Sequence, residues 1–308
     1  MPACRRTLLI VGCGDVGLRV LGHLAGRWQV LATTRSPTRR EALRAAGALP
    51  LVADLDDPLT LGRLGGLADA VLMLAPPPAS GESDLRSRRL VQALARGGRV
   101  QRVVYASTSG VYGNCDGARI DETQALRPAT ARARRRVDAE ASWRRFGNRT
   151  GTIVTILRVP GIYALDRAGG DPRERLRRGA AVLDEADDVF TNHIHADDLA
   201  RACIAALHRG RPQRVLHVCD DSELRMGDYF DLAADLHGLP RPPRITRAQA
   251  QLQMTALQLS FMSESRRLDN RRLRRELGLR LHYPTPAEGL APQPAAADQR
   301  RRREANGG

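Results

Sequence analysis

Short apolar runs alternate with stretches of helical spacing through the first half of the chain. Runs such as TLLIVG (7–12) and RVVYAST (102–108) hold several adjacent apolar residues, which is typical of strands buried on both faces of a sheet. Between such runs, SDLRSRRLVQALARGG (83–98) places apolar residues three and four apart and ends in glycine, as an amphipathic helix does. The alternation predicts an α/β fold with a doubly wound parallel sheet. The predicted strands are 7–12, 29–34, 49–54, 69–76, 102–108 and 152–159, and the predicted helices are 18–25, 36–47, 57–64, 83–98 and 130–146.

The pattern changes near position 160, where the sequence becomes richer in polar and loop-forming residues. We therefore expect the sheet-bearing part to span 1–160 and a smaller region to span 161–287. Helices are expected over 195–210, 223–238 and 265–277, and a strand over 214–220, whose residues 214–219 rejoin the sheet. The segment 288–308 is rich in Pro, Ala and Gln and carries RRRRE, so it is predicted to be a disordered basic tail.

The charge of the chain is unusual in kind as well as in size. Its 308 residues carry a formal net charge of +15, and all 49 residues counted as Lys or Arg are arginine. The absence of lysine excludes a Schiff-base lysine and a P-loop lysine. Nucleic-acid binding is not expected, because the arginines are spread along the chain and few aromatic residues stand among them.

The cysteines, the histidines and the lengths of the apolar runs further limit the class of protein and the kinds of site. The five cysteines are scattered without a close pair, which is typical of reduced thiols in a cytoplasmic protein. No stretch approaches the ~20 apolar residues that a membrane span needs, so no membrane partner is expected. The histidines show no metal-ligand spacing, so no metal site is predicted.

The first predicted strand leads into VGCGDVG (11–17), which has the pattern Gly-x-Gly-x-x-Gly. In this pattern the first glycine permits a tight turn, the second lets the backbone approach a pyrophosphate, and the third lets the helix pack close to the strand. The N-terminus of the following helix adds free N–H groups and a partial positive charge. The turn therefore predicts a dinucleotide site, with a plain tight turn as the alternative. The expected cofactor contacts here are Gly12, Cys13, Gly14, Asp15, Val16 and Gly17, with the carboxylate of Asp15 pointing away from the phosphates.

The end of the second predicted strand, ATTRS, bears on which dinucleotide is bound. An acidic residue at this place holds the ribose 2′-hydroxyl of NAD, whereas arginine suits the 2′-phosphate of NADP. Thr34 stands there and Arg35 follows, so the sequence favours NADP over NAD, unless Arg35 is only a solvated side chain. Asp54 ends the third strand and is expected near the adenine. Its alternative role is a helix cap before Pro58.

Further motifs follow the fifth strand: YASTSGVYG (105–113), RVPGIY (158–163), HADDLA (195–200) and ESRRLDNRRLRRELG (264–278). Together with the glycine turn, they resemble the NAD-dependent epimerase/dehydratase family, the extended short-chain dehydrogenase/reductases, over about residues 1–290. The resemblance implies a Rossmann domain, a smaller substrate-binding region and a homodimer formed partly by the helix 130–146. It implies oxidoreductase or epimerase/dehydratase chemistry on a small molecule.

The same resemblance assigns roles to individual residues. Leu55 is expected beside the adenine, and Ala75 and Pro76 beside the ribose on the nicotinamide side. Val159 is expected beside the nicotinamide, and Thr108 in the position that hydrogen-bonds the reacting oxygen of the substrate.

The helix predicted over 130–146 departs from the family pattern. Family members carry Tyr-x-x-x-Lys there, in which the tyrosine moves a proton while the lysine lowers its pKa and binds ribose. Counting back from Glu140 puts Arg136 in the lysine position and Arg132 in the tyrosine position. Arg136 can still donate to ribose hydroxyls. Arg132, with a pKa above about 12, can clamp a carboxylate or phosphate but cannot carry the proton. A solvated basic helix face is the alternative for both residues.

Three residues are expected to contact the substrate near this gap: Tyr112, Tyr163 and His193. The alternative for the two tyrosines is packing or hydrogen bonding close to the cofactor, and the alternative for His193 is a solvated loop. His195 is expected to organise the HADDLA turn together with Asp197.

Three functions remain open at this stage. The first is an NADP- or NAD-dependent enzyme acting on a carbonyl or hydroxyl carbon of a small metabolite, anionic or a sugar nucleotide. The second is an NADP-binding sensor without turnover, favoured by the missing tyrosine and lysine. The third, a nucleic-acid binder, rests on net charge alone.

Overall fold

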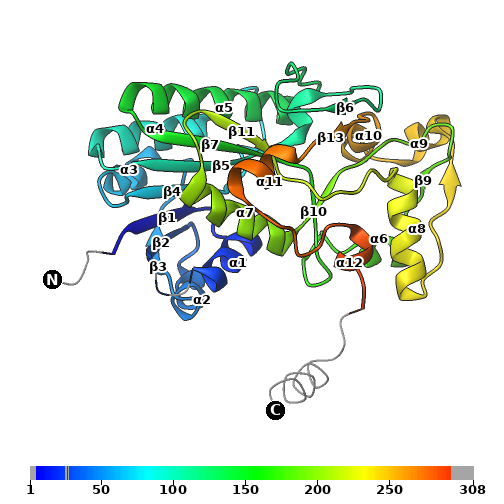
Figure 1. The fold of residues 1–308 in the computed structure, drawn as a ribbon, viewed down its shortest axis with the longest axis horizontal. Helices are drawn as coiled ribbons and strands as arrows, with labels where there is room; N and C mark the ends of the chain where they lie inside the picture. The colour runs from blue at the N-terminus through cyan, green and yellow to red at the C-terminus, as the bar shows by residue number, and fades with distance from the viewer. Residues whose placement is uncertain (1–4, 25, 27, 293–308) are drawn as a thin grey trace, which may run out of the picture.

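The computed structural model describes residues 5–24, 26 and 28–292. Within these residues, seven parallel strands form one sheet with helices on both faces (Figure 1). In sheet order the strands are β11 (Arg214–His217), β7 (Ile153–Val159), β5 (Arg102–Thr108), β4 (Ala70–Met73), β1 (Thr7–Val11), β2 (Gln29–Thr34) and β3 (Leu49–Val52). The predicted doubly wound α/β fold is confirmed, and β11 extends the sheet beside β7.

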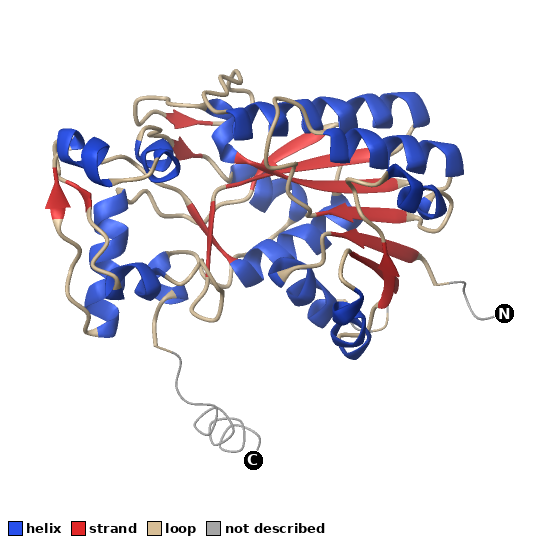
Figure 2. Cartoon of the chain, turned by 180° about the vertical axis from the view of Figure 1, so that it is seen from behind, coloured by secondary structure: helices blue, strands red, loops and turns tan. Residues whose placement is uncertain are grey.

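Two layers of helices enclose the sheet (Figures 1 and 2). One layer consists of α1 (Asp15–His23), α2 (Arg40–Ala45), α7 (Ala196–Arg209) and α11 (Arg271–Leu277). The other consists of α3 (Pro58–Leu61), α4 (Leu85–Gly97) and α5 (Ala131–Thr150). Three 3-10 turns join these elements: η1 (Pro37–Arg39), η2 (Gly62–Leu64) and η3 (Ser109–Tyr112).

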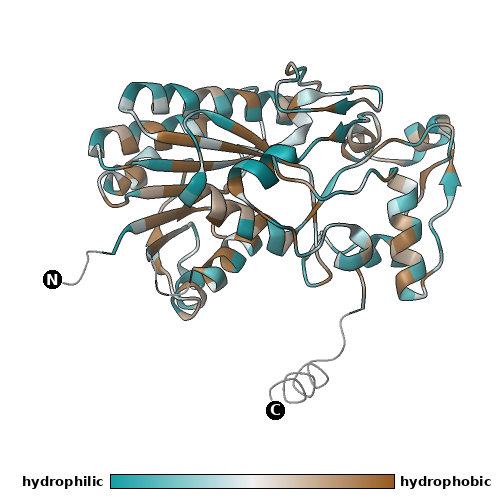
Figure 3. Cartoon of the chain, viewed as in Figure 1, coloured by the Kyte–Doolittle hydropathy of each residue, from teal (hydrophilic) through white to brown (hydrophobic). Residues whose placement is uncertain are grey.

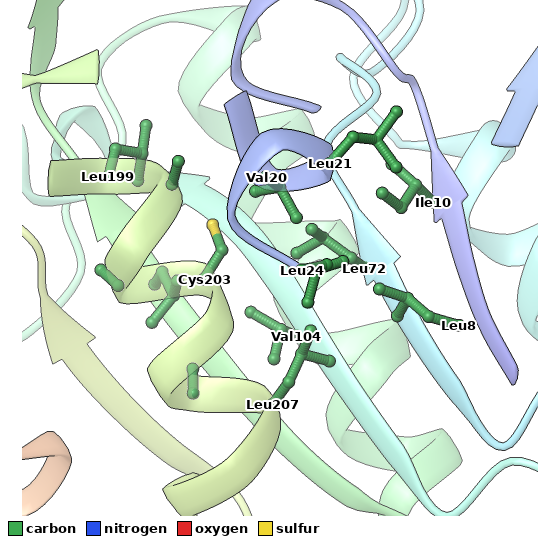
Figure 4. Close-up of a cluster of buried hydrophobic side chains, with 14 of the residues drawn as sticks. Leu8, Ile10, Val20, Leu21, Leu24, Leu72, Val104, Leu199, Cys203 and Leu207 are labelled. Atoms are coloured by element: carbon green, nitrogen blue, oxygen red, sulfur yellow. The ribbon is translucent and has the colours of Figure 1, made fainter. Parts of the chain in front are cut away.

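The apolar strands fold this way because both of their faces are covered. Along β1, Leu8 and Ile10 pack under α1 and α7, whereas Leu9 and Val11 pack in the opposite layer. Figure 4 shows this side of the sheet, where Ile10 lies near Leu21 of α1 and Leu8 lies near Leu72 of β4. Strand interiors are accordingly apolar and the outer helix faces polar (Figure 3). Such burial stabilises by roughly 25 cal/mol per Å² of apolar surface removed from water.

The strand order determines where a ligand can bind. Strand β1 lies between β4 and β2, and the order of strands runs outward in opposite directions from this point. In open parallel sheets, ligands bind beyond the carboxyl ends of the strands at such a reversal. Because the glycine turn follows β1 directly, the topology places that turn at the reversal.

A smaller lobe lies beyond the carboxyl ends of the strands, to the right in Figure 1. Its helices are α6 (Pro172–Arg177), α8 (Met226–His237), α9 (Arg247–Gln253), α10 (Ala256–Met262) and α12 (Pro286–Gly289). Short parallel pairs link the segments: β8 (Gly161–Tyr163) with β10 (His193–His195), β9 (Val182–Leu183) with β12 (Arg244–Ile245), and β6 (Arg119–Ile120) with β13 (Arg267–Leu268). Its own core includes Tyr163, Leu176 and Phe230.

The boundaries expected from sequence need two corrections. Within 161–287, β11 rejoins the sheet as expected, and α7 and α11 also pack into the larger core. The helix predicted over 265–277 is wrong in its first half, where residues 267 and 268 pair with β6 and the helix begins at Arg271. The disordered tail predicted from 288 is wrong for its first residues, since Gly289 belongs to α12 and Leu290 is fully buried. Positions 293–308 of that tail lie outside the described residues.

The helices α9 and α10 were missed, although the sequence carries a signal for both. Each begins with a capping box, Thr246 with Gln249 and Thr255 with Gln258, in which side chain and backbone bond reciprocally. Across the described part of the chain, no helix is long and apolar enough to cross a membrane.

Candidate functional site

Two neighbouring cavities lie at the carboxyl ends of the strands. The smaller, of about 290 Å³, is lined by the glycine turn and the ends of β2 and β3. The larger, of about 850 Å³, lies between the sheet and the smaller lobe. Pro76 and Arg86 line both, so the two cavities adjoin at these residues. This arrangement suits a long ligand that starts at the glycine turn and ends between the two lobes.

The glycine turn is shaped by close approaches of the backbone. Gly12 has φ +84°, and a Cβ there would stand 2.4 Å from the backbone N of Ala75, so only glycine fits. At Gly17 a Cβ would stand 3.0 Å from Sγ of Cys13. At Gly14, by contrast, a Cβ would meet no described atom within 4 Å. The protein itself leaves the space beside Gly14 open, as a ligand that approaches the backbone there requires.

The other residues of the turn stabilise its conformation, and not all of them line the smaller cavity. The carboxylate of Asp15 is held by Arg19, at 3.1 Å, and by Arg167 from the loop after β8. Val16 packs against the core. Cys13 lines the smaller cavity, and burial raises the pKa of its thiol to about 11. A thiol of this kind stays protonated and unreactive near neutral pH.

The far end of the smaller cavity gathers the residues expected around adenosine: Thr34, Arg35, Asp54 and Leu55 all line it. Arg39, which sequence reasoning missed, lines it too and donates through Nη2 to the carbonyl oxygen of Cys13 at 3.0 Å. The sequence offered one signal that Arg39 could line this cavity, namely its position four residues after Arg35. The alternative role for Asp54 is excluded, because Asp57 caps α3 by accepting from the N–H of Leu59 at 3.0 Å.

The larger cavity brings together Thr108, Arg132 and Arg136, which come from β5 and α5. Thr108 ends β5 and pairs in register with Val159 of β7. Its Oγ1 accepts from the N–H of Gly110 at 3.2 Å, which leaves its own O–H free to donate. Val159 does not line the cavity, but the next residue, Pro160, does. Ala75 lines the smaller cavity and Pro76 lines both.

The two arginines of α5 have different surroundings. Arg136 donates through Nη1 to the hydroxyl of Tyr105, at 3.1 Å, and to the carbonyl oxygen of Ala106, at 2.8 Å. It is therefore tied to β5 while still lining the cavity. Arg132 lies with its Cζ 4.5 Å from the ring centre of Phe261 in α10. Burial lowers its pKa, which Glu264 partly offsets. The guanidinium remains charged, since its ordinary pKa is above about 12.

A buried ion pair holds α5 against the sheet. Glu140 is fully buried and accepts from Nε and Nη2 of Arg158 in β7, at 3.1 and 2.8 Å, and from Oγ of Ser107 in β5, at 2.7 Å. Because Glu140 lies one turn beyond Arg136, these bonds set the rotation of the helix. This network was not foreseen, since nothing in the local sequence marks Arg158 as a buried residue.

The three expected substrate contacts are not equivalent. Tyr112 is fully buried away from both cavities, and its hydroxyl bonds to Nε2 of His217 and Nη1 of Arg158, at 2.5 and 2.6 Å. Tyr163 also lies outside the cavity lining and donates to the carbonyl oxygen of Thr285 at 3.3 Å. For both tyrosines the structure supports packing and hydrogen bonding instead. His193 does line the larger cavity.

The histidines of β10 have distinct roles. His193 stacks on Tyr229 with ring centres 3.9 Å apart, and burial lowers its pKa to about 3. It is therefore neutral near pH 7. His195 begins α7, where its Nδ1 accepts from the N–H of Asp197 at 3.2 Å, so it organises the start of that helix as expected.

The smaller lobe contributes lining residues that sequence reasoning missed. They are Arg175, Phe190, Met226, Tyr229, Phe230, Phe261, Glu264 and Arg266. They stand in α6, α8, α10 and the connecting loops. Of these segments only 264–278 was marked by a motif, and no site role was expected for its Glu264 or Arg266. Only the fold brings these segments over the end of β5.

The lining of the larger cavity is strongly basic. Arg132, Arg135, Arg136 and Arg175 line it, and none pairs with a carboxylate of the described residues; their hydrogen bonds go to neutral groups. Among those residues, Glu264 is the one carboxylate in the lining. Many other arginines of the chain form ion pairs. These four lining arginines differ from them, because no carboxylate of the described residues neutralises their charge. A ligand with negative charge would complete it.

Comparisons with known proteins agree with this architecture. A family model described as NAD(P)H-binding matches residues 12–210. A search of the curated proteins finds no match. A functionally unknown conserved protein from Silicibacter pomeroyi DSS is 33% identical, with a TM-score of 0.76, and the match covers 92% of this chain and 96% of that one.

Two solved structures with described activities or ligands are more distant. MoeE5, solved in complex with UDP-glucuronic acid and NAD, is 25% identical with a TM-score of 0.74, over 96% of this chain and 99% of that one. The UDP-glucose 4-epimerase of Thermotoga maritima, solved with UDP-glucose, is 20% identical with a TM-score of 0.75, over 92% and 96%. The likeness to the epimerase shows the fold alone.

Proposed function

We propose that this chain, which belongs to the NAD(P)H-binding family, is an NAD(P)-dependent oxidoreductase or epimerase/dehydratase-like enzyme acting on a carbonyl or hydroxyl carbon of a small anionic metabolite. The observation that carries the proposal is the pair of adjoining cavities, one at the glycine turn and a larger one where Thr108 and two arginines of α5 meet. The resemblance to the epimerase/dehydratase family supports the reaction class.

The residues present fit a dinucleotide. The space beside Gly14 is open, and the backbone at Gly12 and Ala75 is too close for any side chain at position 12. Gly12 to Gly14 would hold the pyrophosphate at the start of α1, and Thr34, Asp54 and Leu55 would surround the adenosine. The nicotinamide, when bound, supplies hydride chemistry at a carbon of the substrate. On this assignment Arg136 would donate to the adjoining ribose.

We propose NADP rather than NAD as the preferred cofactor. No carboxylate stands at the end of β2, where Thr34 is followed by Arg35. Arg39 adds a second guanidinium to the same wall of the smaller cavity. A 2′-phosphate between two arginines would make charge-assisted hydrogen bonds that the 2′-hydroxyl of NAD cannot.

The anionic character of the substrate follows from the arginines of the larger cavity. Arg135 is buried and Arg175 is half-buried, and neither forms an ion pair within the described residues. A carboxylate or phosphate on the substrate would supply a counter-charge. Turnover would take place between Thr108 and Pro160, whose strands end side by side.

A second candidate is a cofactor-binding module without turnover, which senses NADP. Arg132 in the tyrosine position favours it, because a guanidinium cannot transfer a proton near neutral pH. The two adjoining cavities and the free O–H of Thr108 favour the enzyme.

The test has two stages. Calorimetry should show NADPH binding to the purified protein, and its absence would remove both candidates. NADPH oxidation would then be followed at about 340 nm with anionic carbonyl compounds, and we expect Thr108→Val to lower the rate by ~10–10³-fold, the range for losing one hydrogen bond to a reacting oxygen. NADPH binding without turnover on any substrate of the panel would favour the sensor.

A further inference from the structure

The site lacks the group that usually moves the proton, and the lining of the larger cavity shows what could replace it. Beyond its arginines, the titratable groups that line this cavity within the described chain are His193, Tyr229 and Glu264. Hydroxyls of serine and threonine line it too, but aliphatic hydroxyls are not efficient acids or bases without help. The choice is therefore among three side chains.

Two of the three are poorly suited. His193 is held neutral by burial, which lowers its pKa to about 3, so it can hardly accept or give a proton near neutral pH. Tyr229 is buried, and burial together with Asp220 raises its pKa well above the ordinary value of a tyrosine. The two rings stack on each other at 3.9 Å, away from the usual position of the catalytic tyrosine on α5.

Glu264 has the geometry that a proton acceptor needs. Its Oε2 accepts from Nη2 of Arg266 at 2.9 Å, which anchors one oxygen of the carboxylate. No hydrogen bond within the described residues uses its Oε1. The side chain is 11% exposed, enough to be reached from the cavity that it lines.

Glu264 also lies beside Thr108. A Cβ built on Gly110 would stand 3.6 Å from Oγ1 of Thr108 and 3.9 Å from Oε2 of Glu264. The threonine hydroxyl and the carboxylate therefore flank the same glycine. Both groups also line the larger cavity, so a substrate bound there faces the two of them.

We propose that Glu264 is the proton-transfer residue of this site, in place of the missing tyrosine. This rests on the proposed function. In the oxidative direction, a substrate hydroxyl bonded to Thr108 gives its proton to Oε1 of Glu264, and the C–O bond becomes C=O. The carbon loses its hydrogen with both electrons as hydride to the oxidised nicotinamide, which is the co-reactant. In the reductive direction the proton returns from Glu264 to the oxygen.

The groups around Glu264 fit this role. Arg266 bonds to it, and Arg132 faces it from α5, where the two side chains interact electrostatically. Cys115, after η3, is its third titratable neighbour, and burial raises the pKa of that thiol, so it stays neutral. The carboxylate thus lies in the field of two arginines, one of which is Arg132 of α5.

The test compares Glu264→Gln, Glu264→Ala and a matched control, Glu223→Gln. Glu223 is also bound to an arginine, Arg267, but lies outside both cavities. NADPH affinity and the thermal midpoint are measured first. We expect all variants to keep the wild-type NADPH affinity, and the two Glu264 variants to have a lower thermal midpoint, because Arg266 loses its nearly buried partner. Turnover is then measured on the substrate found with the wild type.

We expect Glu264→Gln to lower kcat by ~10²–10⁴-fold, whereas Glu223→Gln leaves kcat unchanged. Added formate should partly restore Glu264→Ala, because it replaces the missing carboxylate. If the glutamine variant is too unstable to assay, formate rescue of the alanine variant decides. Wild-type turnover that survives in Glu264→Gln, or an alanine variant that formate does not restore, overturns this inference alone. Absence of wild-type turnover overturns the proposed function itself.

Discussion

Glu140 and Arg158 form an ion pair inside the protein, with Oε2 and Nη2 2.8 Å apart and both side chains almost completely buried. The pair joins α5 to β7, and Ser107 of β5 adds a bond to the same carboxylate. The hydroxyl of Tyr112 accepts from the other side of the guanidinium at 2.6 Å. This buried ion pair therefore holds α5, the helix that carries Arg132 and Arg136, against the sheet. Its geometry fixes the direction in which the two arginines point.

Replacing one partner of this ion pair should lower the free energy of unfolding more than replacing both partners. Glu140→Gln leaves the Arg158 charge buried without its partner, and we expect the free energy of unfolding to fall by about 3–5 kcal/mol. The double variant Glu140→Gln, Arg158→Met should lose less than Glu140→Gln alone, because no uncompensated charge remains. Urea unfolding followed by circular dichroism measures all three proteins. A double variant as unstable as the single one would contradict this account.

Gly12 and Gly14 should respond differently to the same substitution. Gly12→Ala brings a Cβ within 2.4 Å of backbone at φ +84°, so we expect loss of at least about 2 kcal/mol of stability. Gly14→Ala meets no described atom at φ −89°, so the thermal midpoint should stay close to that of the wild type. Its added methyl group occupies the space expected for pyrophosphate, and NADPH affinity should fall at least ~10-fold. Unchanged NADPH affinity in a folded Gly14→Ala protein would place the cofactor elsewhere.

Arg35 and Arg39 should decide the choice between NADPH and NADH. Each lines the smaller cavity. We expect Arg35→Ala and Arg39→Ala each to weaken NADPH binding by ~10–100-fold, equivalent to ~1.5–3 kcal/mol for a hydrogen bond to a charged group, and to leave NADH affinity nearly unchanged. Arg40→Ala serves as the control, since Arg40 is exposed and does not line the cavity. Equal losses for both nucleotides would instead indicate a role in folding the turn.

Asp220 should make the protein less stable as the pH rises. Oδ1 accepts from Ser222 at 3.0 and 2.6 Å, while Oδ2 is buried without a hydrogen-bond partner, and burial raises the pKa of the carboxyl to about 7. Because this pKa exceeds that of the unfolded chain, about 3.9, the stabilising contribution is complete below pH 4 and is lost as the pH rises through about 7.

The matching variant is Asp220→Asn, which cannot ionise. We expect the stability of the wild type relative to this variant to decrease between about pH 5 and pH 8 by on the order of 1–3 kcal/mol. Chemical unfolding at several pH values within this window provides the measurement. A constant difference across the window would mean that Asp220 does not titrate there.

Most residues at the dinucleotide end of the site could be predicted from the sequence, because they lie in short motifs at the ends of predicted strands. The Gly-x-Gly-x-x-Gly turn, the end of β2 at Thr34 and the end of β3 at Asp54 all lie at the carboxyl ends of adjacent predicted strands. Parallel pairing then brings them to one edge. The smaller cavity contains the expected residues of this edge, together with Arg39.

The residues at the substrate end of the site could not be predicted from the sequence in this way. Tyr112 sits in a motif, yet it points into a buried network with His217 and Arg158, since the side to which η3 turns depends on β7 and β11. Glu264 opens the motif 264–278, but nothing local places it at the site, and only the pairing of β13 with β6 carries its segment back beside Gly110.

The sequence by itself determined the order of strands and helices, the glycine turn and the loss of a tyrosine and lysine on α5. Periodicity and glycine geometry are local properties, so no further information was needed for them. The tertiary structure alone decided which charges remain unpaired, which polar groups are buried, and that Glu264 lies beside Thr108. Burial and pairing depend on contacts between residues distant in sequence, and those contacts are also what give a carboxylate or an arginine its chemical role.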